Sequence, residues 1–266
     1  MANYMKSEFY RILHEKTIYL LTLSIMGLAV SINVVLYLFS ALTPEFRYGT
    51  LRYVFGLMIT GMQLFYIGAM LVVMFLSSDE YKNGVLKNAV AGGIGRVQIF
   101  LGKCIVYGLT ATGSAAVILA GFIVSAQVLL GGNSASPLES IYPLRVMLMG
   151  VAANLPFSLA TVVLTVSLYQ FFQKESEVSI LWLIIISLIP IAVRLLGYKI
   201  PICARIAEWL PWNYMSTQVY VSFSNPQMEA LWMHPQGFLK CIIVGVVGIA
   251  VFGAVGLIGF RKKDIP

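Results

Sequence analysis

Long, almost uncharged runs of apolar residues limit most strongly how this chain can fold. The six longest cover residues 17–41, 56–76, 98–130, 145–172, 178–196 and 238–260. Each is long enough to cross the roughly 30 Å hydrocarbon core of a bilayer as a helix. Lipid offers the backbone no hydrogen-bond partners, so such runs are expected to be helical. The sequence therefore predicts an all-α, polytopic membrane protein, with six transmembrane helices in one domain over residues 1–266.

The composition agrees with lipid as the main solvent. Hydrophobic residues make up 59% of the chain and charged residues 11%, against roughly 25% charged in a typical soluble domain. Lys and Arg outnumber Asp and Glu by 18 to 11. The charges lie at the ends of the apolar runs, where they meet anionic headgroups. This placement argues for lipid, and against nucleic acid, as the partner of the basic side chains.

Basic residues also indicate the orientation, because cytoplasmic loops carry more Lys and Arg. With both ends inside, the inner segments hold eleven basic residues and the outer segments hold seven. The inner residues are Lys6, Arg11, Lys16, Lys82, Lys87, Arg96, Lys103, Lys174, Arg261, Lys262 and Lys263, and the outer ones are Arg47, Arg52, Arg145, Arg194, Lys199, Arg205 and Lys240. We therefore expect cytoplasmic N- and C-termini.

Residues 1–16 have the helical periodicity of an amphipathic helix that lies on the inner membrane surface before the first span. The apolar face consists of Met5, Phe9, Ile12 and Leu13, and the polar faces consist of Lys6, Glu8, Arg11, His14 and Glu15. We expect Phe9, Arg11 and Lys16 to hold this helix at the surface.

The segment 197–237, between the last two apolar runs, contains three of the four tryptophans and is interrupted by four prolines. Proline breaks helices, so the segment is not expected to span the membrane. Tryptophan and tyrosine favour the headgroup layer. We expect short interfacial or re-entrant helices on the outer side, with Trp209, Trp212 and Trp232 forming an outer lid.

A charged, glycine-punctuated island at residues 77–103 separates the second and third apolar runs. Asp79 and Glu80 suit a helix N-terminus, and Gly92, Gly93 and Gly95 would end that helix before Arg96 opens the third span. A short helix held between two rigid spans can transmit a push from a cytosolic partner. The alternative is a solvated loop, and these residues alone favour neither reading.

The apolar runs contain no Asp or Glu. Ion-coupled carriers usually place ionisable groups at membrane depth, so an ion-coupled mechanism is not expected. The neutral polar residues Asn33, Gln63 and Asn154 remain candidates for a translocation path. The alternative for each is a hydrogen bond between helices.

The sequence also lacks the motifs of common catalytic sites. It has no G-x-x-x-x-G-K-[ST] phosphate loop, and its two histidines have no partners for zinc or nucleophilic chemistry. Its three cysteines lack metal-site spacing and are interpreted as apolar filler, with a Cys203–Cys241 bridge as the alternative. We expect no catalytic residue, metal or cofactor on this chain.

The island contains a motif that resembles one in a known family of membrane proteins. Residues 80–87 read EYKNGVLK, followed by Gly95-Arg96 and Gly102-Lys103. This order is similar to that in the permease subunits of type-2 ATP-binding-cassette exporters, although Val85 stands where that family usually has Thr. The opening Glu8-Phe9-Tyr10-Arg11 resembles the amphipathic elbow of the family, and residues 260–265, FRKKDI, resemble its C-terminal signature.

The resemblance implies a half-transporter in a bacterial plasma membrane, similar to bacitracin- and lantibiotic-type transport permeases. A separate cytosolic ATPase would bind ATP and Mg, and a second permease, identical or a paralogue, would complete the path for an amphipathic substrate. The helix at residues 80–88 would contact the ATPase. The expected coupling residues are Glu80, Tyr81, Lys82, Gly84, Val85, Leu86, Lys87 and Arg96. The alternatives are a membrane scaffold or channel not driven by ATP, and an ion-coupled carrier.

Overall fold

The computed structural model describes residues 2–43, 46, 48–83, 93–133, 137–172, 174–221 and 228–262. At residues 2, 78–83, 133, 137–140 and 260–262 it describes the backbone alone. Almost all of the described chain is helical. Five helices are long and apolar enough to cross a membrane, or six if one bent pair counts as a single span. The all-α, multi-pass character predicted from the sequence is therefore confirmed at this level.

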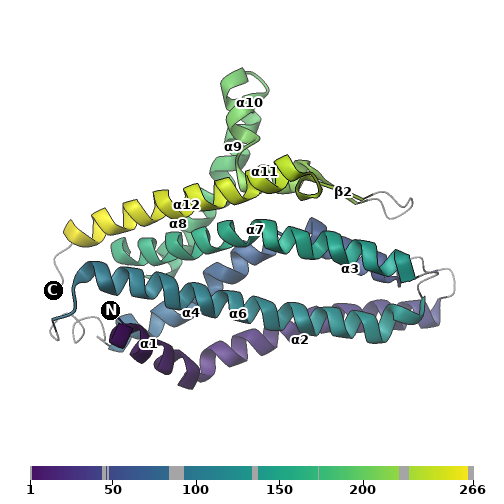
Figure 1. The fold of residues 1–266 in the computed structure, drawn as a ribbon, viewed down its shortest axis with the longest axis horizontal. Coiled ribbons are helices and arrows are strands. Elements are labelled where there is room, and N and C mark those ends of the chain that lie inside the picture. Colours follow the sequence, from purple (N-terminus) through teal and green to yellow (C-terminus); the bar gives the residue numbers. More distant parts are fainter. Residues whose placement is uncertain are drawn as a thin grey trace.

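Four long helices form the body of the molecule: α2 (Lys16–Leu42), α6 (Arg96–Leu130), α7 (Pro137–Phe171) and α12 (Pro235–Lys262). They run side by side along the long axis (Figure 1). α7 is the central one, and its residues 161–170 are all buried. It continues through Pro143 and Pro156 without ending at either proline.

The contact between α7 and α12 depends on a small residue in α12. A Cβ placed at Gly245 would lie 2.5 Å from the Cβ of Pro156, so a larger side chain would force the helices apart. Nearby, the Ser167 hydroxyl donates a hydrogen bond of 3.0 Å to the Phe252 carbonyl oxygen. Close approach and an inter-helix hydrogen bond are typical means of holding helices together in lipid.

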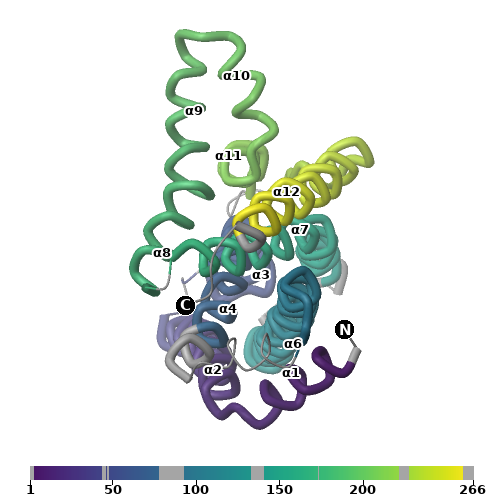
Figure 2. The backbone as a smooth tube through the Cα atoms, turned by 90° about the vertical axis from the view of Figure 1, so that its left-hand side faces the viewer, coloured from purple at the N-terminus to yellow at the C-terminus, as the bar shows by residue number. Residues whose placement is uncertain are grey.

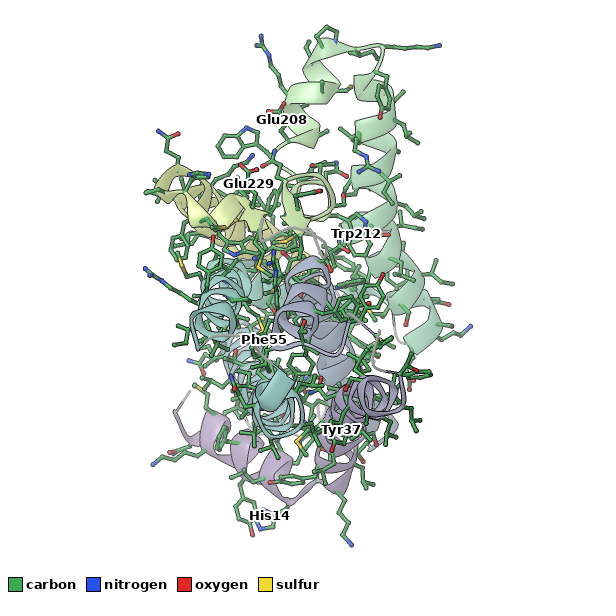
Figure 3. All side chains as sticks on the ribbon, turned by 90° about the vertical axis from the view of Figure 1, so that its right-hand side faces the viewer. His14, Tyr37, Phe55, Glu208, Trp212 and Glu229 are labelled. Carbon is green, nitrogen blue, oxygen red and sulfur yellow. The ribbon has the colours of Figure 1, made fainter. Side chains whose placement is uncertain are left out.

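The second span differs from the expected single helix. It is divided into α3 (Leu51–Thr60) and α4 (Leu64–Asn83), which meet at an angle of 65°. Residues 61–63 form a tight turn in which the Leu64 amide donates to the Gly61 carbonyl oxygen (2.9 Å). α3 also begins five residues before the second apolar run. Its side chains Leu51, Val54 and Phe55 are buried, and Phe55 points into the body (Figure 3).

The fifth apolar run forms one continuous helix: α8 (Glu175–Leu183), the π-helical turn η2 (Ile184–Leu188) and α9 (Ile189–Gly197). Its length agrees with the expected span, but its direction does not match the other spans. α9 and the following α10 (Pro201–Ala207) stand away from the body, across the long helices (Figures 1 and 2). α8 is anchored by the buried Val178 and Trp182, whereas Leu195 and Leu196 of α9 are exposed.

The rest of segment 197–237 is compact. α10 is followed by α11 (Pro211–Thr217), a two-stranded antiparallel hairpin, β1 (Val219–Val221) and β2 (Met228–Ala230), and the turn η3 (Leu231–Met233). The buried Asn213 side chain fastens α11 to α9 by donating hydrogen bonds to the carbonyl oxygens of Pro190 (2.8 Å) and Ala207 (3.2 Å). The expected short helices are present. The strand pairing was not foreseen.

One end of the molecule gathers segments that are distant in sequence. The helix α1 (Ala2–His14), the end of α4, the start of α6, the start of α8 and the end of α12 all lie there (Figure 1). These are the segments that the charge count assigns to a common side. We call this end the basic end.

Candidate functional site

At the basic end, α1 is docked on α6 by a small charged cluster. Glu8 is buried, and its Oε1 accepts a hydrogen bond of 2.8 Å from Arg11 Nη2. The same Arg11 nitrogen lies 3.3 Å from the hydroxyl of Tyr107 in α6. Arg11 Nη1 lies 3.9 Å from a carboxylate oxygen of Glu15. A buried carboxylate needs such a partner, because an unpaired charge is costly away from water.

Close packing supports the same contact. Gly102 of α6 lies directly beneath Tyr4, so that an added Cβ would be 2.9 Å from the tyrosine ring. Ile12, one turn beyond Glu8, is also buried. The face of α1 that contacts the protein is therefore Tyr4, Glu8 and Ile12.

This arrangement corrects part of the expected amphipathic pattern. Glu8 was assigned to a polar face but is buried against α6, while Phe9 and Leu13 of the apolar face are 42% and 51% exposed. A face that is exposed and apolar on a membrane-surface helix suits contact with lipid. Lys16 is exposed at the start of α2, and Arg11 has an internal structural role in addition to its charge.

The described parts of the island place only some of the expected coupling residues. The backbone of Glu80, Tyr81 and Lys82 lies in the last turns of α4, which runs to Asn83, so the expected helix start at Asp79-Glu80 is wrong. Gly84, Val85, Leu86 and Lys87 lie outside the described residues. Arg96 is the first residue of α6, after Gly93 with a φ of +79° and the extended Gly95. Arg96 therefore opens α6 directly after glycines, whereas Gly92 and the helix that the glycines were expected to end lie outside the described residues.

The three neutral polar residues proposed for a translocation path lie in three different places. Asn33 of α2 is buried, and its Nδ2 donates to the Phe122 carbonyl oxygen (3.0 Å) and Ser125 Oγ (2.7 Å) of α6. Gln63, in the α3–α4 turn, donates to the Trp212 carbonyl oxygen at 3.3 Å. Asn154 of α7 accepts a hydrogen bond of 2.9 Å from the Tyr66 hydroxyl. Each of them ties one element to another.

The three tryptophans assigned to an outer lid also differ in environment. Trp209 is 51% exposed, and the Lys240 ammonium lies 5.3 Å from its ring centroid. Trp212 is half-buried at the junction between the projecting helices and the body (Figure 3). Trp232 is fully buried and donates a hydrogen bond of 2.9 Å to the Val146 carbonyl oxygen. It serves as a packing anchor between η3 and α7, and the outer lid of three tryptophans stays a prediction.

Tyr214 of α11 is buried close to Trp209 and Lys240. The Lys240 ammonium lies 5.7 Å from the centroid of its ring. Burial, together with the nearby Tyr66, raises the pKa of the Tyr214 phenol further above its ordinary value. The aromatic segment is thus joined to the start of α12 by a cation over two rings.

The structure contains a cavity that the sequence did not indicate. It has a volume of about 400 Å³ and lies among α2, α3, α4, α6 and α7; we call it the interhelical cavity. Its walls are mainly apolar, with Leu28, Phe65, Leu119 and Phe122 among them. Asn154 is the only one of the three candidate path residues that lines it. Gly68, inside the second apolar run, was the available signal, because a glycine leaves space on the face of a helix.

The described residues contain no group of three or more His, Cys, Asp or Glu side chains that could hold a metal ion. Cys104, Cys203 and Cys241 are free thiols, so the alternative of a Cys203–Cys241 bridge is not realised in this structure. Cys241 is buried and Cys203 is half-buried, in agreement with their interpretation as apolar filler.

No protein-family model matches the chain, and no curated protein matches it either.

Proposed function

We propose that this chain is the transmembrane subunit of an ATP-driven exporter. In this proposal it is a permease of the type-2 ATP-binding-cassette kind and carries no catalytic residue of its own. A separate cytosolic ATPase binds ATP and Mg, and a second permease, identical or a paralogue, completes the translocation path. The cargo is an amphipathic peptide or antibiotic-like molecule. The protein lies in a bacterial plasma membrane with both termini in the cytoplasm.

One observation carries the proposal: the order and spacing of the family-like motifs, together with the position of their described members. These motifs belong to α1, to the start of α6 and to the end of α12, which are three separate parts of the sequence. The three segments lie at the basic end (Figure 1). A soluble ATPase would need such a collected surface on one side of the membrane.

The docking of α1 on α6 supports a mechanical role for this end. The contacts of Arg11 with Glu8 and Tyr107 join the surface helix to the third span. A displacement applied to the island just before Arg96 would therefore move α1 and α6 together, because a buried, hydrogen-bonded contact joins these two helices.

Co-purification tests the proposal. The chain is expressed with its chromosomal neighbours and purified through a tag on the N-terminus, and the expected result is an associated nucleotide-binding protein whose ATPase activity changes when the chain is added. Glu80→Ala, or replacement of the Gly84-Val85-Leu86 stretch by three alanines, should lose both the association and the transport. Glu208→Ala, at the end of the projecting α10 and away from the basic end, is the matched control and should retain both.

Two outcomes would count against the exporter. Purification without any nucleotide-binding protein, with transport unaffected by the island substitutions, would favour a scaffold or channel that does not use ATP. Transport that collapses with a protonophore while ATP is maintained would favour an ion-coupled carrier.

A further inference from the structure

The interhelical cavity lies near the middle of the helices that form it. Its wall includes Leu21, Leu28 and Ile32 of α2, Ala115 and Phe122 of α6, and Val151 and Ser158 of α7. In spans that cross a bilayer, the middle of each helix lies at the depth of the lipid acyl chains. The medium available to fill the cavity is therefore hydrocarbon.

Exposed apolar side chains border the cavity. Leu28 and Ile32 of α2 are 68% and 49% exposed, and Leu64 of α4 is 62% exposed. The cavity is thus not closed off inside the bundle, since its wall continues onto the outer surface along α2 and α4. A chain from the surrounding lipid can enter without crossing a polar layer.

The polar side chains of the wall already have partners. Thr22 Oγ1 lies 2.8 Å from the Ile18 carbonyl oxygen and 3.1 Å from Ser114 Oγ. Thr112 donates to the Gly108 carbonyl oxygen at 2.8 Å, and Asn154 is bonded to Gly150 and Tyr66.

The fifth polar residue, Ser158, lies 3.5 Å from the Phe65 carbonyl oxygen. Each polar side chain of the wall thus already makes at least one hydrogen bond within the protein, so a polar ligand or water would gain little here. Apolar cavities of this kind stay dry and accept apolar molecules.

The size of the cavity fits one hydrocarbon chain. A cavity of about 150 Å³ accepts a benzene molecule, with six carbon atoms. By that ratio, the volume of about 400 Å³ accommodates roughly sixteen carbon atoms. This is the length of one acyl chain, and too little for a whole amphipathic peptide.

We propose that the interhelical cavity is a binding site for one acyl chain of a membrane lipid. The headgroup of that lipid remains in the bilayer, and its chain enters past Leu28 and Leu64 to pack against Leu119 and Phe122. The site needs no ATPase and no second permease, so it stands or falls independently of the exporter proposal.

Gly68 offers a direct way to test the site. It lies on the α4 wall, and an added Cβ would meet no atom within 4 Å. Gly68→Phe therefore places a ring in the cavity without displacing the backbone. Gly113 of α6 is the matched control, since it is also helical with no atom within 4 Å of an added Cβ, but it does not line the cavity.

The full-length chain is reconstituted into phosphatidylethanolamine vesicles that contain a phosphatidylglycerol with a diazirine midway along one acyl chain. After irradiation, mass spectrometry locates the label. The unaltered chain and Gly113→Phe should carry label on Leu119 and Phe122 as well as on the outward-facing Val124 and Val128. Gly68→Phe should lose the first pair and keep the second.

A second filling variant guards against misfolding of the first. Ala115→Phe fills the cavity from the α6 wall and should give the same selective loss, while label retained on Val124 and Val128 reports that the chain is inserted and folded. Equal labelling of Leu119 and Phe122 in the filled and unaltered chains would overturn the proposal.

Other occupants would also overturn it, each with its own signature. Cavity labelling that appears only with an acylated peptide carrying the diazirine, and not with the lipid probe, would assign the site to cargo. A disulfide between two copies of a Gly68→Cys variant, in a background with alanine at the three native cysteine positions, would place a second copy there.

Discussion

At the scale of single residues, Trp232 shows how far burial can depart from expectation. The side chain is fully buried, its indole nitrogen donates to Val146, and its ring packs over Gly150. Trp209, in the same segment, is half exposed. Composition and position alone cannot separate these two tryptophans, because the difference arises from which of them faces α7.

Replacing Trp232 by alanine should destabilise the protein strongly, whereas the same change at Trp209 should have little effect. Truncation of a buried tryptophan costs about 3–5 kcal/mol. The measurement is thermal unfolding of each purified variant in the same detergent. Equal losses in the two variants would contradict the assigned burial.

Asn33 illustrates a polar residue in a span whose partner could not be named in advance. We expect Asn33→Leu to weaken the contact between α2 and α6, because the hydrogen bonds to Phe122 and Ser125 are lost. Hydrogen bonds between membrane helices contribute about 0.6 kcal/mol on average. Ser31→Ala is the control, since Ser31 is exposed and bonds only to Leu28 of its own helix.

The same thermal unfolding assay measures both variants. A loss at Ser31 as large as that at Asn33 would show that the link between the two helices is not the cause.

At the scale of elements, the docking of α1 on α6 makes a specific prediction. Gly102→Leu should push Tyr4 away and release α1, since even a Cβ at this position would lie 2.9 Å from the ring. Hydrogen exchange should then accelerate at the amides of α1. Gly113→Leu, on the same helix but in open space, should leave the exchange of α1 unchanged.

Equal rates of hydrogen exchange at the α1 amides in the unaltered chain and in Gly102→Leu would show that α1 is not docked on α6 in most molecules.

The sequence predicted the elements better than their relations. The long apolar runs predicted α2, α6, α7 and α12 to within a few residues at most ends, because lipid demands long apolar helices. The break at residues 61–63 was missed, since Gly61 and Gln63 are tolerated in a span and only the tertiary contact of Gln63 with Trp212 reveals their role. The direction of α9 was missed because an apolar run indicates length and not orientation.

The candidate site was predicted only in outline. Helical periodicity placed α1, but it assigned Glu8 to solvent, because a buried carboxylate becomes acceptable only with the partners that the fold supplies. For the interhelical cavity the sequence offered Gly68 alone as a signal, since the position and size of the cavity depend on how five helices pack. Residues 84–87 of the predicted coupling segment stay a prediction from the motif.

At the scale of the whole molecule, the grouping of segments at the basic end predicts the sidedness of labelling. In a background with alanine at the three native cysteine positions, cysteines at Lys6 and Lys174 should react with a membrane-impermeant maleimide from the same side. Cysteines at Tyr48 and at His234, just before the start of α12, should react from the other side. All four native side chains are exposed.

Sealed vesicles of known orientation provide the measurement, and permeabilised vesicles provide the control in which all four positions react. Reaction of Lys6→Cys and Lys174→Cys from opposite sides would contradict the common placement of α1 and the start of α8 at the basic end (Figure 1).

The tight turn at residues 61–63 affects how movement at the basic end reaches the other end of the molecule. A tilt applied to one end of a straight helix reaches its other end in full, whereas a tilt applied to one of two helices joined by a short turn does not. α3 contacts β1, and Gln63 in the turn after α3 donates a hydrogen bond to Trp212. α4 ends at Asn83 at the basic end. Movement of the Asn83 end of α4 can therefore be taken up by bending at residues 61–63, while Leu51, Val54 and Phe55 keep their places in the interior.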